Sequence, residues 1–355
     1  MKPIQAPGYT INFNELGYEQ LSNHLLESNY SGIFIITDSN CNENCLGYFL
    51  QNLATDIAIE IIEIEPGEEN KSIETCVQVW NVLTELGADR KSLIINLGGG
   101  VITDLGGFVA STYKRGIAYI NVPTTLLAMV DASVGGKNGV DLGVLKNQIG
   151  VISNPKMVLI DTNYLQTLQE NQMRSGLAEM LKHGLIFDRN YWNIFQDLTN
   201  LNTDDLEALI HQSVEIKNKI VSQDFTENGI RKALNFGHTL GHAIESYFLE
   251  NETKKSLLHG EAIAAGMVME AFLSKQKKII SAEEYFEIKT TILSIFNTIP
   301  LEENDFNSVI DLLVHDKKNE FGIIKFALLN GIGNTMLDQT AENEQIIAAF
   351  LDYKS

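Results

Sequence analysis

The sequence predicts an α/β domain with a largely parallel sheet, followed by an all-α domain. Two observations lead to this prediction: short apolar runs alternate with amphipathic segments in the first half, and after about residue 165 the pattern is almost wholly helical. The chain has 355 residues, more than one typical domain contains. We therefore expect two domains, residues 1–168 and 169–355, with a ligand-binding cleft between them.

Apolar runs rich in β-branched residues are the predicted strands of the first domain. Their apolar residues are mostly continuous rather than alternating, as expected of parallel strands that are buried on both faces. Helical segments separate these runs, and one of them should end at Gly87, because glycine favours the conformation that terminates many helices. The predicted strands are residues 32–37, 57–64, 92–97, 117–122 and 156–160, and the helix before Gly87 is residues 69–86.

The second half predicts helices over most of residues 174–315. Apolar positions recur three and four residues apart, and Thr203 and Ser281 are followed by acidic residues in the manner of helix N-caps. A short pair of strands, residues 322–329 and 334–337, is expected near the end of the chain.

The charge balance excludes two classes of partner. The chain has 46 acidic residues against 26 Lys and Arg, a formal net charge of −20, and such a field repels nucleic acid and anionic membranes. No apolar run is as long as a membrane span, and the N-terminus lacks the apolar core of a signal peptide. The three cysteines are too few for a disulfide framework, so reduced thiols and a cytoplasmic location are expected.

A cluster of histidines indicates a divalent-metal site. His238 and His242 lie four residues apart, which places both imidazoles on one face of a helix, and His259 follows after a short polar segment. Two histidines at this spacing, together with a carboxylate, are a reasonable set of metal ligands. The alternative is a pair of hydrogen-bonded histidines with a structural role.

Two turns that follow predicted strands have sequences suited to binding a nucleotide. Residues 97–104 carry three consecutive glycines and open a helix, so backbone N–H groups and the helix N-terminus can approach a pyrophosphate. The spacing differs from the dinucleotide fingerprint G-x-G-x-x-G, and a simple tight turn is the alternative. In residues 66–71, polar side chains either meet a ribose or cap the helix that follows.

Polar residues within the otherwise apolar segment 121–138 predict a phosphate site. Two threonines follow a strand, Asp131 comes next, and two glycines precede Lys137; Lys146 and Asn147 stand nine and ten residues after Lys137. Ammonium groups, an amide and flexible glycines suit a phosphate, whereas a solvated loop needs no such combination. Further bases would contribute if they converge on the cleft: Arg115, Lys217, Arg231 and the pair Lys317 and Lys318.

Together these motifs resemble those of 3-dehydroquinate synthase, a sugar-phosphate cyclase, in the family's order from about residue 66 to residue 318. The chain departs from the family pattern at residues 168–173, which lack a Leu-Pro-x-Arg-Glu element, at Ala132, which replaces a serine, and between His242 and His259, where a charged insertion occurs. The matching segments are residues 98–108, 113–116, 123–128, 131–137, 146–147, 176–182, 231–245 and 259–262.

The resemblance implies an NAD- and zinc-dependent lyase of the shikimate pathway, in aromatic amino acid biosynthesis. Its substrate would be the sugar phosphate 3-deoxy-D-arabino-heptulosonate 7-phosphate, and its products 3-dehydroquinate and phosphate. The implied sequence of steps is transient oxidation by NAD, phosphate elimination, re-reduction, ring opening and intramolecular aldol closure, so the net reaction is redox-neutral. The first domain would bind NAD, the second would bind metal and substrate, and the protein would be a homodimer.

Matching motif positions imply a role for each residue. The implied ligands of Zn²⁺ or Co²⁺ are Glu179, His238 and His259, a set that revises the pairing of His238 with His242. The residues implied to face the substrate or its phosphate are His242, Lys182, Lys217, Arg231, Asn235, Lys137, Asn147, Arg115 and either Lys317 or Lys318. The implied NAD contacts are Glu68, Lys71, Gly99, Gly100, Val101, Asp104, Thr124, Thr125, Asp131, Lys137 and Lys146.

Three other functions remain open at this stage. Metal-dependent polyol or alcohol dehydrogenases share the expected fold outline, but they need no phosphate cluster such as Lys137 and Lys146. A related sugar-phosphate cyclase would act on a substrate that lacks the carboxylate to which Lys217, Arg231 and Asn235 are suited. A binding protein without activity would not need metal ligands, a nicotinamide-binding loop and a phosphate site together.

Overall fold

The computed structural model describes residues 1–143, 145–197, 202–313 and 324–355. Contacts within the chain divide it into two units, and each is described by itself. Unit 1 comprises Met1–Gly143, Asn147–Gln169 and Glu207–Asn218, and unit 2 comprises Val144–Lys146, Glu170–Leu206 and Lys219–Ser355. The predicted domains 1–168 and 169–355, and the cleft between them, stay predictions.

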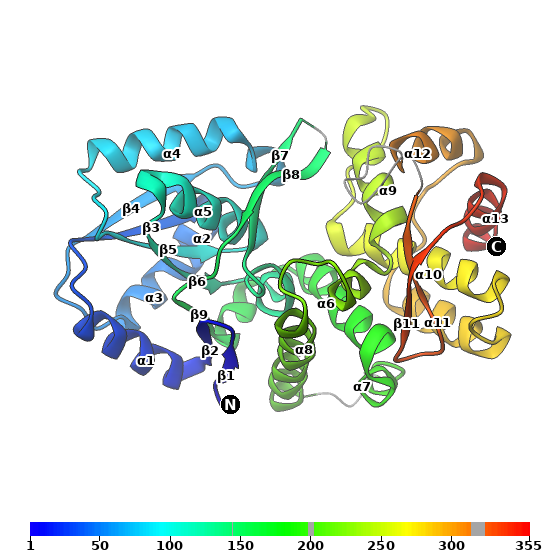
Figure 1. Ribbon diagram of the computed structural model, residues 1–355, viewed down its shortest axis with the longest axis horizontal. Coiled ribbons are helices and arrows are strands. Elements are labelled where there is room, and N and C mark those ends of the chain that lie inside the picture. Colours follow the sequence, from blue (N-terminus) through cyan, green and yellow to red (C-terminus); the bar gives the residue numbers. More distant parts are fainter. Residues whose placement is uncertain (144, 198–201, 314–323) are drawn as a thin grey trace. The chain divides into compact units, whose positions relative to one another are not determined.

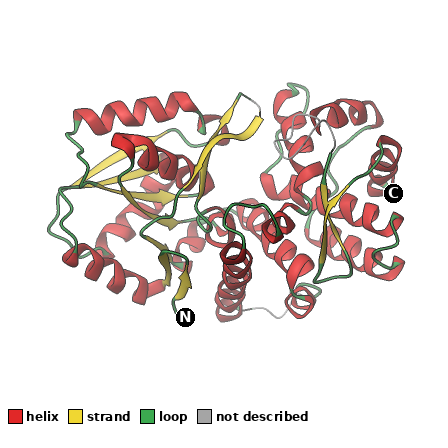
Figure 2. Ribbon diagram, viewed as in Figure 1, coloured by secondary structure: helices red, strands yellow, loops and turns green. Residues whose placement is uncertain are grey.

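Unit 1 is built on a seven-stranded sheet with the order β1-β2-β9-β6-β5-β3-β4 (Figures 1 and 2). The edge strand β1 pairs antiparallel with β2, and the other described pairs of this sheet are parallel. The strands are β1 Ile4–Ala6, β2 Tyr9–Phe13, β3 Ile33–Asp38, β4 Ile59–Ile64, β5 Leu93–Gly98, β6 Ala118–Pro123 and β9 Met157–Ile160. The predicted, largely parallel α/β sheet is therefore confirmed.

Each strand predicted from an apolar run is present, as β3, β4, β5, β6 and β9. The sequence did not predict β1, β2 or a separate two-stranded sheet, β7 (Lys137–Leu142) and β8 (Leu145–Ile152). The segment of β7 and β8 is rich in glycine, asparagine and charged residues, which are depleted in strands, so its composition indicates a loop. This segment carries three predicted site residues, Lys137, Lys146 and Asn147.

Helices α4 and α5 pack on one face of the sheet of unit 1. The apolar cluster between them joins Phe34, Ile36 and Ile94 of the strands to Val79 of α4 and Leu105 of α5. The predicted helix 69–86 is a 3₁₀ turn, Glu68–Asn70, followed by α4, and Gly87 beyond it has the predicted left-handed conformation with φ 77°. The helices of unit 1 are α1 Asn14–Glu27, α2 Ser39–Cys41, α3 Gly47–Asn52, α4 Ile73–Glu85 and α5 Gly100–Thr112.

Unit 2 is mainly helical, as predicted, and α10 lies at its centre (Figure 1). Helix α10 is buried along its length and packs against α6, α9, α11, α13 and β10. A helix that is apolar on every side is expected in such a position. The helices are α6 Glu170–Phe187, α7 Arg189–Ile194, α9 His238–Glu250, α10 His259–Gln276, α11 Ala282–Ile295, α12 Phe306–Leu313 and α13 Asn343–Lys354; α8, Thr203–Gln223, is divided between the units.

Of the two predicted helix N-caps, Ser281 is confirmed and Thr203 is wrong. Ser281 caps α11 in a capping box with Glu284, as expected. The cap of α8 is Asn202 and not Thr203, because the Asn202 side chain accepts the Asp205 N–H and the Asp205 carboxylate accepts the Asn202 N–H. The predicted strand pair is present as β10 (Phe326–Leu329) and β11 (Thr335–Gln339), although the first residues predicted for it, 322 and 323, lie outside the described part of the chain.

Replacing Ile36 by alanine should destabilise unit 1. Ile36 is fully buried between the sheet and its helices, and such a truncation costs about 2–5 kcal/mol of unfolding free energy. Ile61, on the edge strand β4, is 44% exposed, so Ile61→Ala should cost about 1 kcal/mol or less. Urea unfolding followed by circular dichroism compares the two variants. Equal shifts of the midpoint would contradict this placement of the two side chains.

Candidate active site

Helices α6, α9 and α10 of unit 2 bring the three implied metal ligands together. Glu179 lies in the middle of α6, and His238 and His259 are the first residues of α9 and α10. Glu179 Oε1 lies 3.4 Å from His238 Nε2 and 3.6 Å from His259 Nε2. Zinc bonds of about 2.1 Å in a tetrahedral site place neighbouring ligand atoms about 3.4 Å apart. The spacing of these atoms therefore fits a single cation.

His242, one helical turn after His238, also lies at this cluster. Ligand atoms of His238, His242 and His259 lie within 4.8 Å of one another. The ring centroids of His238 and His242 are 5.1 Å apart, and those of His242 and His259 are 5.7 Å apart. The structure thus also brings together the His238–His242 pair that the spacing alone had suggested as metal ligands.

The hydrogen bonds of the histidines favour the set that includes Glu179. His238 Nδ1 lies 3.1 Å from the Phe236 carbonyl oxygen, and His259 Nδ1 lies 3.2 Å from Glu245 Oε2. Because a carbonyl or carboxylate oxygen accepts, each Nδ1 carries the proton and donates. The Nε2 atoms face Glu179, and they are the atoms that would bind a metal, with the proton on His259 Nε2 displaced by the cation. Metal-binding histidines commonly have such a partner on the other nitrogen.

Glu179 is a fully buried carboxylate. Neither of its oxygens accepts a hydrogen bond of normal geometry from a described residue, although Oε2 forms an ion pair with Lys182, one turn further along α6. A buried carboxylate is costly unless positive charge or hydrogen bonds compensate it. A divalent cation between Glu179 and the two histidines would supply that charge, so the residues present fit such an ion.

The surroundings shift the pKa values of Glu179, His238 and His259 in different directions. Burial alone raises the pKa of Glu179, but Lys182 and His238 hold it well below its usual range. Burial and Lys182 lower the pKa of His238 to about 4, so its imidazole is neutral, the form that binds a metal. Burial also lowers the pKa of His259, but the carboxylates of Glu245 and Glu179 outweigh it and raise the value to about 10.

Close contacts between helices set the spacing of the ligands. The Gly260 N–H donates to Ser175 Oγ at 2.9 Å, and a Cβ at Gly260 would lie 2.3 Å from the Ser175 carbonyl oxygen. A Cβ at Gly266 would lie 2.0 Å from the Gly237 carbonyl oxygen. Only glycine permits such approaches. Since Ser175 precedes Glu179 by one turn of α6, and Gly260 follows His259, the first contact holds these two ligands side by side.

A buried carboxylate of α10 holds the N-terminus of α9. Glu270 is fully buried, and its two oxygens accept the N–H groups of Gly237 at 2.7 Å and Leu240 at 3.0 Å. The first N–H groups of a helix lack intrahelical partners, and negative charge is favourable beside them. His238 is the first residue of this helix, so Glu270 helps to place its imidazole. The sequence analysis missed Glu270, because its partners are 33 and 30 residues away and no local spacing marks it.

Two implied substrate residues lie in the turn that leads into α9. Arg231, in the 3₁₀ turn Ile230–Asn235, is 1% exposed, and its Nη1 donates to the Phe225 carbonyl oxygen at 2.6 Å. Asn235 Nδ2 donates to Glu227 Oε1 at 2.8 Å. The Asp224 carboxylate accepts the backbone N–H of Arg231 at 3.1 Å, which helps to fix the start of the turn. Lys182 and His242 lie in the neighbouring helices α6 and α9.

The implied NAD residues of unit 1 gather at the carboxyl ends of β5 and β6, which are adjacent and parallel. The glycine-rich turn leads from β5 into α5, whose first residue is Gly100, followed by Val101 and Asp104. The Thr124 N–H donates to the Gly98 carbonyl oxygen at 3.0 Å, and the Thr125 side chain packs beside Gly99. A helix N-terminus at this edge of a parallel sheet is a common place for a nucleotide phosphate.

The buried Lys71 joins two other predicted residues, which are partly exposed, in one cluster. Its Nζ donates to Asp104 Oδ2 at 2.6 Å and to Asn147 Oδ1 at 2.7 Å. Burial alone lowers the pKa of Lys71, but Asp104, Glu68 and Asp141 raise it above its usual value. Asn147 has a positive φ of 52°, and its N–H donates to Asp141 Oδ1 at 2.6 Å. The sequence analysis did not identify Asp141, which fixes the backbone of Asn147.

The buried Lys217 and the partly exposed Asp131 form an ion pair in unit 1. Lys217 Nζ donates to both the carbonyl oxygen and Oδ1 of Asp131, each at 2.6 Å. Asp131 lies in the π-helical turn Ala128–Ala132, and a Cβ at Gly100 would lie 3.5 Å from the Ala132 side chain. Asp131 and Lys217 therefore lie next to the glycine-rich turn.

The implied phosphate contact Arg115 lies away from the glycine-rich turn. Arg115 follows the C-terminus of α5, whereas the glycine-rich turn is at its N-terminus, and a 13-residue helix is about 20 Å long. Lys317 and Lys318 lie outside the described residues. Roles for these three residues stay predictions.

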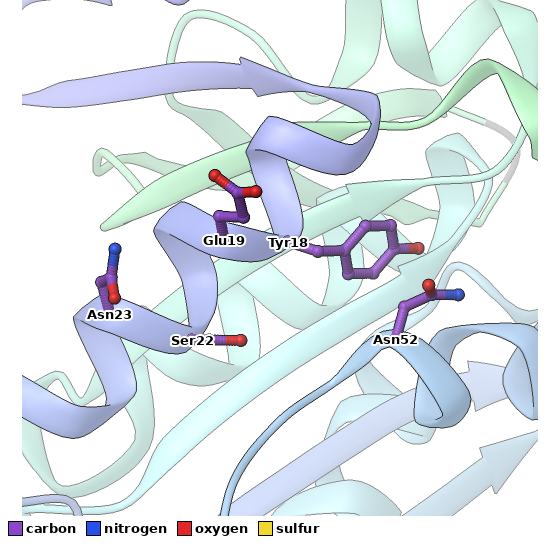
Figure 3. A pocket seen from close by; sticks show the side chains of 5 residues that line it. All are labelled: Tyr18, Glu19, Ser22, Asn23 and Asn52. Atoms are coloured by element: carbon purple, nitrogen blue, oxygen red, sulfur yellow. The ribbon is translucent and has the colours of Figure 1, made fainter.

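A separate hollow on the surface of unit 1 is unrelated to the predicted residues. Figure 3 shows the side chains that line it, from α1 and the end of α3, and none of the implied site residues is among them. Its lining residues are Tyr18, Glu19, Ser22, Asn23 and Asn52.

Comparison with known proteins decides the family. Models described as the N-terminal and C-terminal parts of 3-dehydroquinate synthase match residues 61–175 and 176–319. A 3-dehydroquinate synthase of Parabacteroides distasonis is 41% identical over 338 residues, which are 94% of this chain and 95% of that protein. The chain belongs to the 3-dehydroquinate synthase family. It is an enzyme with that activity, which belongs to the shikimate pathway.

Solved structures show the same fold. A crystal structure of 2-deoxy-scyllo-inosose synthase complexed with carbaglucose-6-phosphate, NAD⁺ and Co²⁺ has a TM-score of 0.84 and 25% identity, and covers 99% of both chains. NADH-dependent butanol dehydrogenase A from Thermotoga maritima has a TM-score of 0.63 and 13% identity, and covers 99% of this chain and 97% of its own. The second likeness is one of fold alone.

The helices that the structure describes include none with both the length and the apolar character needed to cross a membrane.

Replacing Glu270 by glutamine should destabilise unit 2. An amide offers one acceptor oxygen where the carboxylate offers two, so one of the N–H groups of α9 is left facing an NH₂ group. The loss of one charge-assisted bond costs about 1.5–3 kcal/mol of unfolding free energy. Glu344→Gln, at an exposed position of α13, is the matched control and should have little effect. Thermal unfolding of both variants tests this, and indistinguishable midpoints would show that Glu270 does not hold the helix.

Proposed function

We propose that this enzyme converts 3-deoxy-D-arabino-heptulosonate 7-phosphate into 3-dehydroquinate and phosphate, at a metal site formed by α6, α9 and α10. The observation that carries the proposal is the convergence of His238 Nε2 and His259 Nε2 on one oxygen of the buried Glu179. NAD is the proposed second cofactor. A homodimer is proposed from the family resemblance, and a cytoplasmic location from the small number of cysteines.

Glu179, His238 and His259 would hold Zn²⁺ or Co²⁺, and His242 would remain available to the substrate. When bound, such an ion acts as a Lewis acid on substrate oxygens. The chain itself prepares the ligand atoms: Phe236 and Glu245 accept from the two Nδ1 atoms, and the contact of α6 with α10 keeps Glu179 beside His259.

NAD would bind where the glycine-rich turn, the two threonines and the Lys71 cluster meet the carboxyl ends of β5 and β6. When bound, it accepts a hydride from the substrate and returns it, so that it is not consumed. The backbone N–H groups at the start of α5 suit the pyrophosphate. The proposed contacts are Glu68, Lys71, Gly99, Gly100, Val101, Asp104, Thr124, Thr125, Asp131, Lys137 and Lys146.

Buried bases would bind the anionic substrate despite the net charge of −20. Each charge-assisted hydrogen bond contributes about 1.5–3 kcal/mol, whereas exposed charges beyond about 10 Å are screened by salt. Lys182, Lys217 and Arg231 are at most 5% exposed, so little solvent weakens their contacts. The proposed substrate contacts are Lys137, Asn147, Lys182, Lys217, Arg231, Asn235, His242 and, from the resemblance alone, Arg115 and Lys317 or Lys318.

We assign proton transfer to His242 and Lys182. His242 lies one turn from the ligand His238 and is only partly buried, so it is accessible to a substrate held at the metal. Lys182 is held beside Glu179 by their ion pair. Each carries an N–H that can move a proton at a substrate oxygen or carbon bound beside the cation.

Metal content distinguishes the two possible ligand sets. Glu179→Ala, His238→Ala and His259→Ala should each lose bound zinc, because each removes a ligand atom, while His242→Ala should keep it. Elemental analysis of the purified variants, with the unmodified chain as reference, measures this. A metal-free His242→Ala variant would favour the ligand set that includes His242.

The reaction should release phosphate without accumulating NADH. The enzyme is mixed with NAD, Zn²⁺ and the heptulosonate phosphate, and phosphate and absorbance at 340 nm are followed together. A steady rise in NADH would indicate a dehydrogenase instead. Sedoheptulose 7-phosphate, which lacks the carboxylate, is the control substrate, and its turnover at an equal rate would contradict the role assigned to Lys217, Arg231 and Asn235.

A further inference from the structure

Glu245 links a proposed metal ligand to a lysine, and it is neither a proposed ligand nor a proposed substrate contact. It lies on α9, seven residues after His238 and three after His242, so all three side chains are on one face of that helix. Its side chain is buried. Glu245 Oε2 lies 3.2 Å from His259 Nδ1, and Glu245 Oε1 lies 3.3 Å from Lys146 Nζ. Both oxygens therefore have partners.

We propose that Glu245 is a positioning residue that fixes the imidazole of His259 for metal binding. It acts through His259 and does not contact the cation itself. This inference rests on the metal site proposed above, in which His259 binds through Nε2.

His259 needs such support more than the other ligands do. Its side chain is 27% exposed, compared with 10% for His238 and 0% for Glu179. It is the first residue of α10, and the residue before it, Leu258, has extended backbone. Packing therefore restricts its ring less than it restricts the other two side chains. The hydrogen bond to Glu245 supplies the missing restraint, because it sets both the tautomer and the direction of Nε2.

The two histidines differ in the chemistry of their partners. The partner of His238 Nδ1 is the backbone carbonyl of Phe236, a neutral group only two residues away. The partner of His259 Nδ1 is a carboxylate from a different helix. A carboxylate increases the basicity of the imidazole that donates to it, so the more exposed ligand is also the stronger donor to a metal.

Lys146 compensates the charge of Glu245. A buried carboxylate is costly without nearby positive charge, and the ammonium at 3.3 Å supplies such charge independently of His259. The carboxylate can therefore stay ionised as the acceptor for His259 when a metal occupies the site.

Glu245→Ala should weaken metal binding about 10–100-fold, the usual loss when the partner of a ligand histidine is removed. Glu245→Gln keeps the shape and one neutral acceptor, so it should fold like the parent and show a smaller loss. Glu250→Gln, at the exposed end of α9, is the matched control and should bind metal like the parent. Competition with a chromogenic chelator gives the dissociation constants for Zn²⁺ and Co²⁺, without any measurement of activity.

A second readout separates positioning from simple structural support. The visible absorption of bound Co²⁺ reports the geometry and basicity of its ligands, so the Glu245→Gln spectrum should differ from that of the parent. A role confined to stabilising α9 would lower the unfolding temperature of the metal-free protein and leave this spectrum unchanged. Unchanged dissociation constants and spectra in both Glu245 variants would overturn the inference.

The proposed metal site and the proposed role of Glu245 can be overturned separately. If Glu179→Ala loses metal while Glu245→Ala binds it like the parent, the metal site stands and only the role of Glu245 is overturned. If Glu179→Ala and His259→Ala both retain parental affinity, the proposed ligand set is wrong, and the inference falls with it.

Discussion

The organisation of unit 2 depends on one buried charge. Glu179 lies at the centre of α6 without solvent contact, and two imidazole nitrogens and the Lys182 ammonium surround it. A carboxylate in such a position is unstable unless positive charge is held against it. Lys182 of α6 and His259, at the start of α10, supply such charge, while the neutral imidazole of His238, at the start of α9, also faces the carboxylate.

The packing around α10 makes this arrangement possible. Gly260 allows α6 to approach the start of α10, and Gly266 allows the start of α9 to approach its middle. Glu270 then provides the capping carboxylate for α9, from inside the same helix. One buried helix thus fixes the position of both histidines relative to Glu179. This explains why α10 is buried on every side and still contains a charged residue at its core.

The acidic composition is compatible with the lysines proposed to contact anionic ligands, because each of these lysines is paired locally. Lys71 lies against Asp104, Lys217 against Asp131, and Lys146 against Glu245. Each pair holds an ammonium in a defined place, at low exposure, where a net charge spread over the whole surface has little effect. An anionic ligand that reaches these lysines meets donors that are already oriented, and it loses less free energy in ordering them.

The sequence by itself determined the fold class, and the three metal ligands that it implied, Glu179, His238 and His259, lie together in the structure. Continuous apolar runs predicted the buried strands β3 and β5, helical periodicity predicted the second half, and the motifs from Gly98 to Ala262 led to the family. These signals are local, so they can be read along the chain. The tertiary structure alone decided the rest: the strands β7 and β8, the capping role of Glu270, and the partner of His259. Those features depend on groups that are far apart in sequence and come into contact only when helices and strands pack. Local sequence patterns do not predict such contacts.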